Sequence, residues 1–173
     1  GSFRMGEEGV FSNGKCIFMA PPARLVPELM QNLFDWMGKA RDTVHPLVLS
    51  SVFHYEFVFI HPFSDGNGRI ARLWQTSLLM GWDEIFQYLP IENQIHRFQN
   101  DYYQAISDSH VAGESTAFVT FMLKMIDEVL SELMVTADSN PNPYVRRLLD
   151  VMEYGRLYTA QELLGLLGLK SRL

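Results

Sequence analysis

Most hydrophobic residues of this chain recur at the spacing of an α-helix. From Pro27 the apolar positions follow an i, i+3, i+4 pattern up to Gly38, which predicts a first helix with proline in its first turn. A second segment begins at about Pro46 and is apolar almost all round as far as Ile60, which predicts a buried central helix. Further helices are expected from Gly68, over 91–107 and over 115–135.

The first 20 residues follow a different pattern. The segment 15–19 has the composition of a short strand, and Ser12-Asn13-Gly14 before it is a turn signal. A β-hairpin is therefore predicted within about 4–20, ended by Pro21-Pro22. The predicted fold class is all-α, a helical bundle with one small β-hairpin.

The composition changes near the C-terminal end. The segment 137–143 is rich in Asn and Pro and is typical of a linker. Apolar residues at helical spacing resume after it, so we expect a main domain over 1–136 and a short helical tail over 144–173. The tail has five basic and three acidic residues, which is weak support for contact with DNA.

Composition and charge exclude several classes of protein. With 173 residues, 47% of them hydrophobic, the chain has enough apolar material for one domain and is not a disordered protein. Its net charge of −6 argues against a nucleic-acid scaffold, and no apolar run approaches the roughly 20 residues of a membrane helix. The single cysteine, Cys16, permits no internal disulfide and favours a cytoplasmic location. Gly1-Ser2 is typical of a cleaved tag, which would make the chain a fragment.

The segment from His61 to Arg72 concentrates the candidate chemistry. Gly66 and Gly68 allow successive backbone N–H groups to turn toward one point at the start of a helix, where an anion can bind. Arg69 and Arg72 share a face of the first turns, where cations oppose the helix dipole unless a polyanion is present. These features predict a triphosphate site.

Two further residues of this segment suit a transfer reaction. Asp65 is an acidic side chain beside the predicted phosphates, a usual ligand for Mg²⁺ that bridges phosphate oxygens. His61 lies four residues earlier, and its ordinary pKa near 6.5 suits a general base for a hydroxyl nucleophile. Each feature alone is more often structural, and it is their coincidence at one helix start that favours a site.

Two alternative sites follow from the same residues. The run from Gly66 to Ala71 matches the G-x-G-x-x-A dinucleotide fingerprint, but no strand and no acidic residue follow at the required spacing. A zinc site from His54, His61 and Asp65 would lack a further ligand from this region. The other histidines are interpreted as structural or surface residues.

The segment 61–72 resembles the signature of the Fic family, H-P-F-x-[D/E]-G-N-G-R-x-x-R, with every specified position matched. The resemblance extends over about 4–135 and implies a Fic-type helical bundle with a flap hairpin. It also implies a protein adenylyltransferase (AMPylator), with Mg-ATP as substrate and a hydroxyl-bearing protein as acceptor. Residues 144–173 resemble the start of the winged helix-turn-helix that follows some Fic domains.

The resemblance implies a role for each matched residue. His61 would take the proton from a Ser, Thr or Tyr hydroxyl, and Asp65 would hold Mg²⁺ on the phosphates. Tyr102 and Tyr103 would border the adenine site. The residues that would bind the phosphates are Gly66, Asn67, Gly68, Arg69 and Arg72. The flap residues that would bind the target as an added strand are Cys16, Ile17, Phe18 and Met19.

One departure from the family pattern concerns regulation. Many Fic proteins carry an inhibitory motif, S/T-x-x-x-E-G/N, whose Glu pairs with the second arginine of the signature. No Ser or Thr in this chain has a Glu four positions later. We therefore expect Arg72 to be unpaired by any Glu of this chain, and the fragment to be more active than a longer parent protein.

Three functions remain open at this point. The first is the adenylyltransferase. The second is a regulatory module that senses a nucleotide and contacts DNA through the C-terminal region, and the third is a Fic enzyme that transfers or removes another phosphate-bearing group. Homodimerisation is also left open, and binding to a membrane is not expected.

Overall fold

The protein is described here by a computed structural model that covers residues 2–12 and 14–139. The chain falls into two compact units, 1–129 and 130–173, and every candidate site residue belongs to the first. The predicted helical tail over 144–173 lies outside the described residues, as do residues 140–143 of the predicted linker. No helix of the described part is long and apolar enough to cross a membrane.

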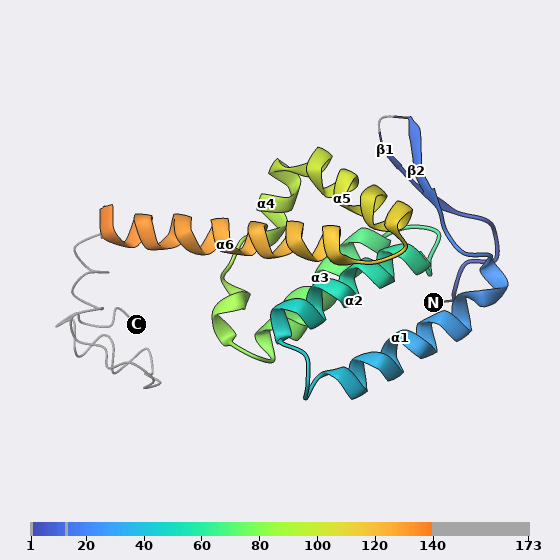
Figure 1. Cartoon of the computed structure of the whole chain (residues 1–173), viewed down its shortest axis with the longest axis horizontal. Coiled ribbons are helices and arrows are strands. Elements are labelled where there is room, and N and C mark those ends of the chain that lie inside the picture. Colours follow the sequence, from blue (N-terminus) through green and yellow to red (C-terminus); the bar gives the residue numbers. More distant parts are fainter. Residues whose placement is uncertain (1, 13, 140–173) are drawn as a thin grey trace, which may run out of the picture. The chain divides into compact units, whose positions relative to one another are not determined.

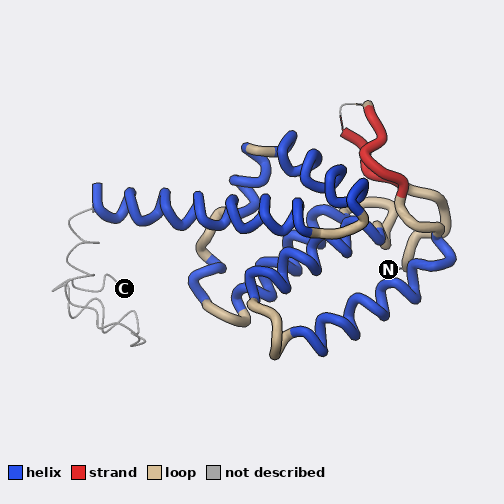
Figure 2. Tube along the Cα trace, in the orientation of Figure 1, coloured by secondary structure: helices blue, strands red, loops and turns tan. Residues whose placement is uncertain are grey.

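The described residues form a two-stranded hairpin, six α-helices and two short 3₁₀ turns (Figures 1 and 2). This confirms the predicted fold class. In chain order the elements are β1 (Gly9–Ser12), β2 (Lys15–Met19), η1 (Ala23–Leu25), α1 (Val26–Ala40), α2 (Pro46–Ile60), α3 (Asn67–Met80), η2 (Glu84–Gln87), α4 (Ile91–Arg97), α5 (Gln99–Ala112) and α6 (Thr116–Ser139).

Helix α2 lies at the centre of the first unit, as its apolar pattern predicted. It packs against α3 and α1, and an aromatic group joins the three helices. The rings of Phe34 from α1 and Phe53 from α2 are 5.6 Å apart, and Phe53 is 5.3 Å from Trp74 of α3. Phe118 of α6 is fully buried and lies 5.2 Å from the ring of His54 in α2. Side chains on several faces of α2 are therefore enclosed.

The hairpin is antiparallel and lies against α5 and the end of α2. Val10 pairs with Phe18, and the register shifts between Val10 and Phe11. Phe18 is 4% exposed, and its ring stacks on Phe59 at 5.7 Å and lies 5.1 Å from the ring of His110. One buried aromatic side chain thus fixes the hairpin on the helical bundle.

The predicted helix over 91–107 is two helices. The backbone leaves the helical conformation at Phe98, with φ −107° and ψ 38°, so α4 ends at Arg97 and α5 begins at Gln99. No proline or glycine lies in this segment, so the sequence contains no local signal for the break. The hydrophobic pattern alone therefore did not reveal the change of direction.

Candidate functional site

His61 lies where the central helix ends. It is the C-cap residue of α2 and has left-handed backbone angles, φ 50° and ψ 60°. It is the only non-glycine residue with positive φ in the described part of the chain. Such a conformation is unfavourable for an L-residue and is held by its surroundings. Pro62 follows, and a residue before proline is disfavoured in the right-handed helical region.

The imidazole of His61 is held in the state that a base requires. Its Nδ1 lies 3.2 Å from the carbonyl oxygen of Val58, which can only accept, so Nδ1–H donates and Nε2 keeps its lone pair. Burial holds the pKa of His61 below its ordinary value of 6.5. The hydrogen bond to Val58 raises this pKa, the charge of Arg4 lowers it further, and the charge of Glu8 raises it. The ring is therefore neutral at pH 7.

Helix α3 begins without a capping side chain. Its N-cap is Gly66, with φ 83°, and its first turn contains no acidic residue. Among the described residues, no group accepts a hydrogen bond from the backbone N–H of Asn67, Gly68 or Arg69. Three unpaired amides at a helix N-terminus form an anion site, because they point along the positive end of the helix dipole.

Both glycines of the loop leave room for an arginine side chain. A Cβ atom at Gly68 would lie 3.3 Å from Nη1 of Arg72, and one at Gly66 would lie 3.4 Å from Nη2 of Arg69. The two guanidinium groups therefore lie close to the first turn of α3. Two cations and three free amides converge on one helix start, which is the arrangement predicted for a polyphosphate.

Asp65 lies in the same loop, and both of its carboxylate oxygens interact with neighbouring residues. Its Oδ1 accepts from the N–H of Gly66 at 2.6 Å, and its Oδ2 is 3.2 Å from Nη2 of Arg69 in an exposed ion pair. No group of three His, Cys, Asp or Glu in the described residues could hold a metal ion. A single carboxylate fits Mg²⁺ that binds together with nucleotide phosphates, which is how proteins usually hold this ion.

Asn67 closes the loop rather than facing outward. Asn67 is buried, with 2% of its surface exposed. Its Oδ1 accepts a hydrogen bond from the N–H of Phe63 at 2.9 Å, and its Nδ2 donates to the carbonyl oxygen of Phe63 at 2.6 Å. This reciprocal pair fixes the distance between the end of α2 and the start of α3. The backbone amide of Asn67 stays available for the predicted phosphate site, and its side chain does not.

Arg72 is paired, contrary to the expectation from the sequence. Its Nε lies 2.9 Å from Oε1 of Glu92, the second residue of α4. The expectation was wrong because it considered only one local motif, whereas this carboxylate comes from the packing of α4 beside α3. The pair borders a hollow of about 430 Å³ that Arg69 and the buried Gln75 also line.

Replacing Glu92 with glutamine is expected to strengthen ATP binding modestly. The side chains of Arg72 and Glu92 are 24% and 66% exposed, and ion pairs of this kind contribute about 0–1 kcal/mol. A phosphate that no longer displaces a carboxylate should gain up to about fivefold in affinity. Calorimetric titration with Mg-ATP measures this, with the exposed Glu84→Gln as control; an unchanged Kd in E92Q would show that the pair does not compete.

The two predicted adenine-site tyrosines lie in different environments. Tyr102 is 5% exposed, and its hydroxyl lies 3.1 Å from Nε2 of the fully buried His54. His54 also pairs through Nδ1 with Oε1 of Gln75, and burial lowers the pKa of His54 to about 4. This chain of contacts joins α2, α3 and α5 inside the core. Tyr103 is only half-buried and is the member of the pair with accessible surface.

The predicted flap residues divide between anchoring and exposure. Phe18 points into the core, so it anchors the hairpin. Cys16 is exposed and Met19 is 54% exposed, so both are accessible to another chain. The side chain of Ile17 lies outside the described residues. Strand addition along β2 stays a prediction.

Both alternative sites fail on geometry. The segment before the loop is helix α2, not a strand, so the glycine fingerprint has no βαβ context. His54 is neutral and enclosed by Gln75 and Tyr102, and it takes no part in a metal cluster among the described residues. A dinucleotide fold and a zinc centre are therefore excluded for this segment.

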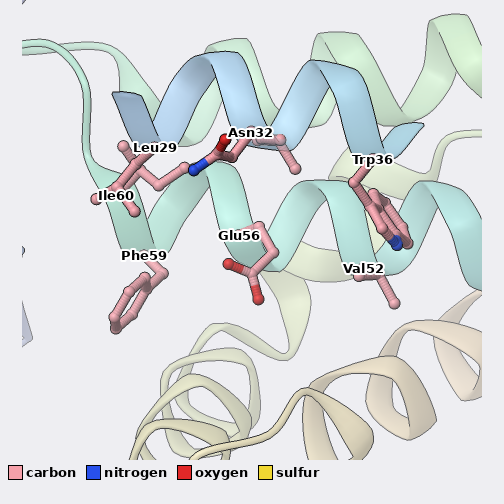
Figure 3. A pocket seen from close by; sticks show the side chains of 8 residues that line it. Leu29, Asn32, Trp36, Val52, Glu56, Phe59 and Ile60 are labelled. Atoms are coloured by element: carbon pink, nitrogen blue, oxygen red, sulfur yellow. The ribbon is translucent and has the colours of Figure 1, made fainter. Parts of the chain in front are cut away.

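A separate groove lies between α1 and α2 (Figure 3). Its volume is about 290 Å³, and it includes none of the predicted site residues. Apolar side chains from both helices surround Glu56, whose pKa is raised by burial. Figure 3 shows Asn32 and Trp36 entering from α1 and Glu56, Phe59 and Ile60 from α2. The groove is distinct from the loop between α2 and α3.

Two residues near the loop could not be found from the sequence. Arg4 is buried and donates to backbone carbonyls at the end of α2, although a lone arginine near an N-terminus carries no signal. Glu92 reaches Arg72 only because α4 packs beside α3. Both contacts depend on tertiary structure, and no spacing rule predicts them.

Comparisons with known proteins find one family. The Fic/DOC family model matches residues 1–79. The chain is 32% identical over 125 residues to a protein named protein adenylyltransferase Fic from Nematostella vectensis, covering 70% of this chain and 27% of that protein. It is 33% identical over 104 residues to protein adenylyltransferase fic-1 from Caenorhabditis elegans, covering 57% of this chain and 18% of that protein. The chain thus spans about a quarter or less of these two relatives.

Solved structures show the same fold. A Fic family protein from Desulfovibrio desulfuricans is 41% identical, with a TM-score of 0.73, over 99% of this chain and 51% of that one. A Fic domain containing signaling protein from Bacteroides thetaiotaomicron, 22% identical with a TM-score of 0.56 over 81% of this chain and 56% of that one, supports the fold alone. The chain therefore carries a domain of the Fic/DOC family.

Proposed function

We propose that this chain is the catalytic part of a protein adenylyltransferase, which transfers AMP from Mg-ATP to a Ser, Thr or Tyr hydroxyl of a target protein or of itself. The observation that carries the proposal is the position of a neutral His61 beside an uncapped helix start and two arginines. The names of the relatives from Nematostella and Caenorhabditis support the same activity.

Each part of the site has a step in this reaction. Nε2 of His61 takes the proton of the target hydroxyl, whose oxygen then attacks the α-phosphorus. The bond between the α-phosphorus and its bridging oxygen breaks, and pyrophosphate leaves. The amides of α3, with Arg69 and Arg72, stabilise the charge on the leaving oxygens. A Mg²⁺ ion held by Asp65 would neutralise part of the phosphate charge.

The proposal is tested by mass spectrometry after incubation with Mg-ATP and a cell lysate. We expect an AMP adduct on the chain itself or on a lysate protein, and no adduct with the His61→Asn variant. Binding of ATP without any adduct would favour the nucleotide-sensing module instead. An adduct of another mass would favour transfer of a different phosphate-bearing group.

A further inference from the structure

Arg4 is a buried cation that serves backbone oxygens only. It is 4% exposed. Its guanidinium donates to the carbonyls of His61 at 2.7 Å, Gly6 at 2.7 Å and Ile60 at 3.3 Å, and to that of Pro21. No carboxylate pairs with it among the described residues. Its charge is therefore balanced by carbonyl dipoles.

These carbonyls belong to two parts of the site. Ile60 and His61 form the C-terminal end of α2, where carbonyls lack helical partners and the helix dipole is negative. Gly6 precedes β1 and Pro21 follows β2, so they lie at the two ends of the hairpin segment. One planar guanidinium thus joins the turn that contains the base to both ends of the flap hairpin.

The same residue stabilises the unusual backbone of the base. Arg4 bonds the carbonyl oxygens of Ile60 and His61 through its side chain, and its own N–H donates to Pro62 at 2.9 Å. Three consecutive carbonyls around the left-handed His61 are thereby fixed. A single non-glycine residue with φ 50° needs such support, because its Cβ atom comes too close to the following carbonyl oxygen in the left-handed conformation.

We propose that Arg4 is a positioning residue for the transfer step: its guanidinium holds His61 in the left-handed conformation and fixes the flap hairpin to the same turn. The proposal rests on the proposed function of His61 as the base. Arg4 touches no substrate in this scheme, and the predicted phosphate site at α3 does not include it. Its loss should therefore affect the chemical step more than nucleotide binding.

The charge of Arg4 gives the proposal an independent readout. It lowers the pKa of His61, in the same direction as burial, whereas the Val58 carbonyl and Glu8 raise it. Asp65 in the loop and Arg69 in the first turn of α3 are paired with each other. Removing the Arg4 charge should raise the pKa of His61, so the rate should begin to fall at a higher pH as the solution is acidified.

The experiment compares Arg4→Gln and Arg4→Lys with the exposed Arg24→Gln as control. Titration of the His61 ring by NMR, assigned with His61→Asn, should show a raised pKa in R4Q and a nearly unchanged one in R4K. The kcat for AMP transfer should fall about 10- to 100-fold in R4Q and less in R4K, because misplacing a reacting group costs rates of this order. The KM for ATP should stay close to that of the wild type in both variants.

Several results would overturn the proposal. An unchanged pKa of His61 and an unchanged kcat in R4Q would do so, as would a loss confined to the KM for ATP. If R4Q does not fold, the kcat of R4K tests the proposal, because lysine keeps the charge but cannot reach all the carbonyls that the guanidinium reaches. A wild-type kcat in R4K would then refute the positioning role. Absence of transfer in the wild type would refute the proposed function separately, since the NMR titration does not depend on activity.

Discussion

Replacing His61 with alanine is expected to slow AMP transfer by about 10²- to 10⁴-fold and to leave ATP binding nearly unchanged. The base is needed only when the hydroxyl attacks. The amides of α3 and the two arginines, which hold the phosphates in our proposal, do not depend on the imidazole. Transfer is measured under single-turnover conditions, and ATP affinity is measured by calorimetry on the same samples.

His61→Asn is the matched variant for this comparison. Asparagine tolerates the left-handed backbone better than most residues, so H61N preserves the turn while its amide cannot act as a base. Both variants should lose transfer to a similar extent. A slow H61A but a fast H61N would show that the turn, and not the base, limits the reaction.

Replacing Asp65 with asparagine is expected to remove most of the Mg²⁺ dependence of ATP binding. A hydrogen bond or contact to a charged group contributes about 1.5–3 kcal/mol, so the stimulation by Mg²⁺ should fall by about 10- to 100-fold. Asparagine keeps an oxygen that can accept from the N–H of Gly66, so the loop is retained. ATP affinity is measured with Mg²⁺ and with EDTA.

Asp42→Asn serves as the control for this change, because Asp42 is an exposed residue in the turn between α1 and α2. It should retain the full response to Mg²⁺. If D65N binds ATP with the same response to Mg²⁺ as the wild type, Asp65 is not the metal ligand. Its role would then be limited to the contacts with Gly66 and Arg69.

The local elements of this fold could be predicted because each has a local cause. The segment 15–19 with the composition of a strand forms β2, and the all-round apolar segment from Pro46 forms the enclosed α2. The start of α3 was also predictable, since Gly66 can adopt φ 83° and no side chain caps the helix. These features depend on residues that are close in the sequence.

Features that depend on packing could not be predicted. Asn67 was expected to bind phosphate; its backbone amide is available for this, but its side chain is hydrogen-bonded to the backbone of Phe63. Arg72 was expected to be free, but α4 brings Glu92 to it. Arg4 contacts His61 across 57 positions of the sequence, and only the folded chain brings the two together. These three contacts join residues that are far apart in the sequence or lie in separate elements, so no local pattern could predict them.

The most direct test of the central claim compares two labelled forms of ATP. Incubating the chain and its target with α-³²P-ATP and Mg²⁺ should label protein, and γ-³²P-ATP should not, because the γ-phosphate leaves with pyrophosphate. The α-label should be absent with H61N. Label from γ-³²P-ATP, or α-label that persists in H61N at the wild-type rate, would contradict AMP transfer with His61 as the base.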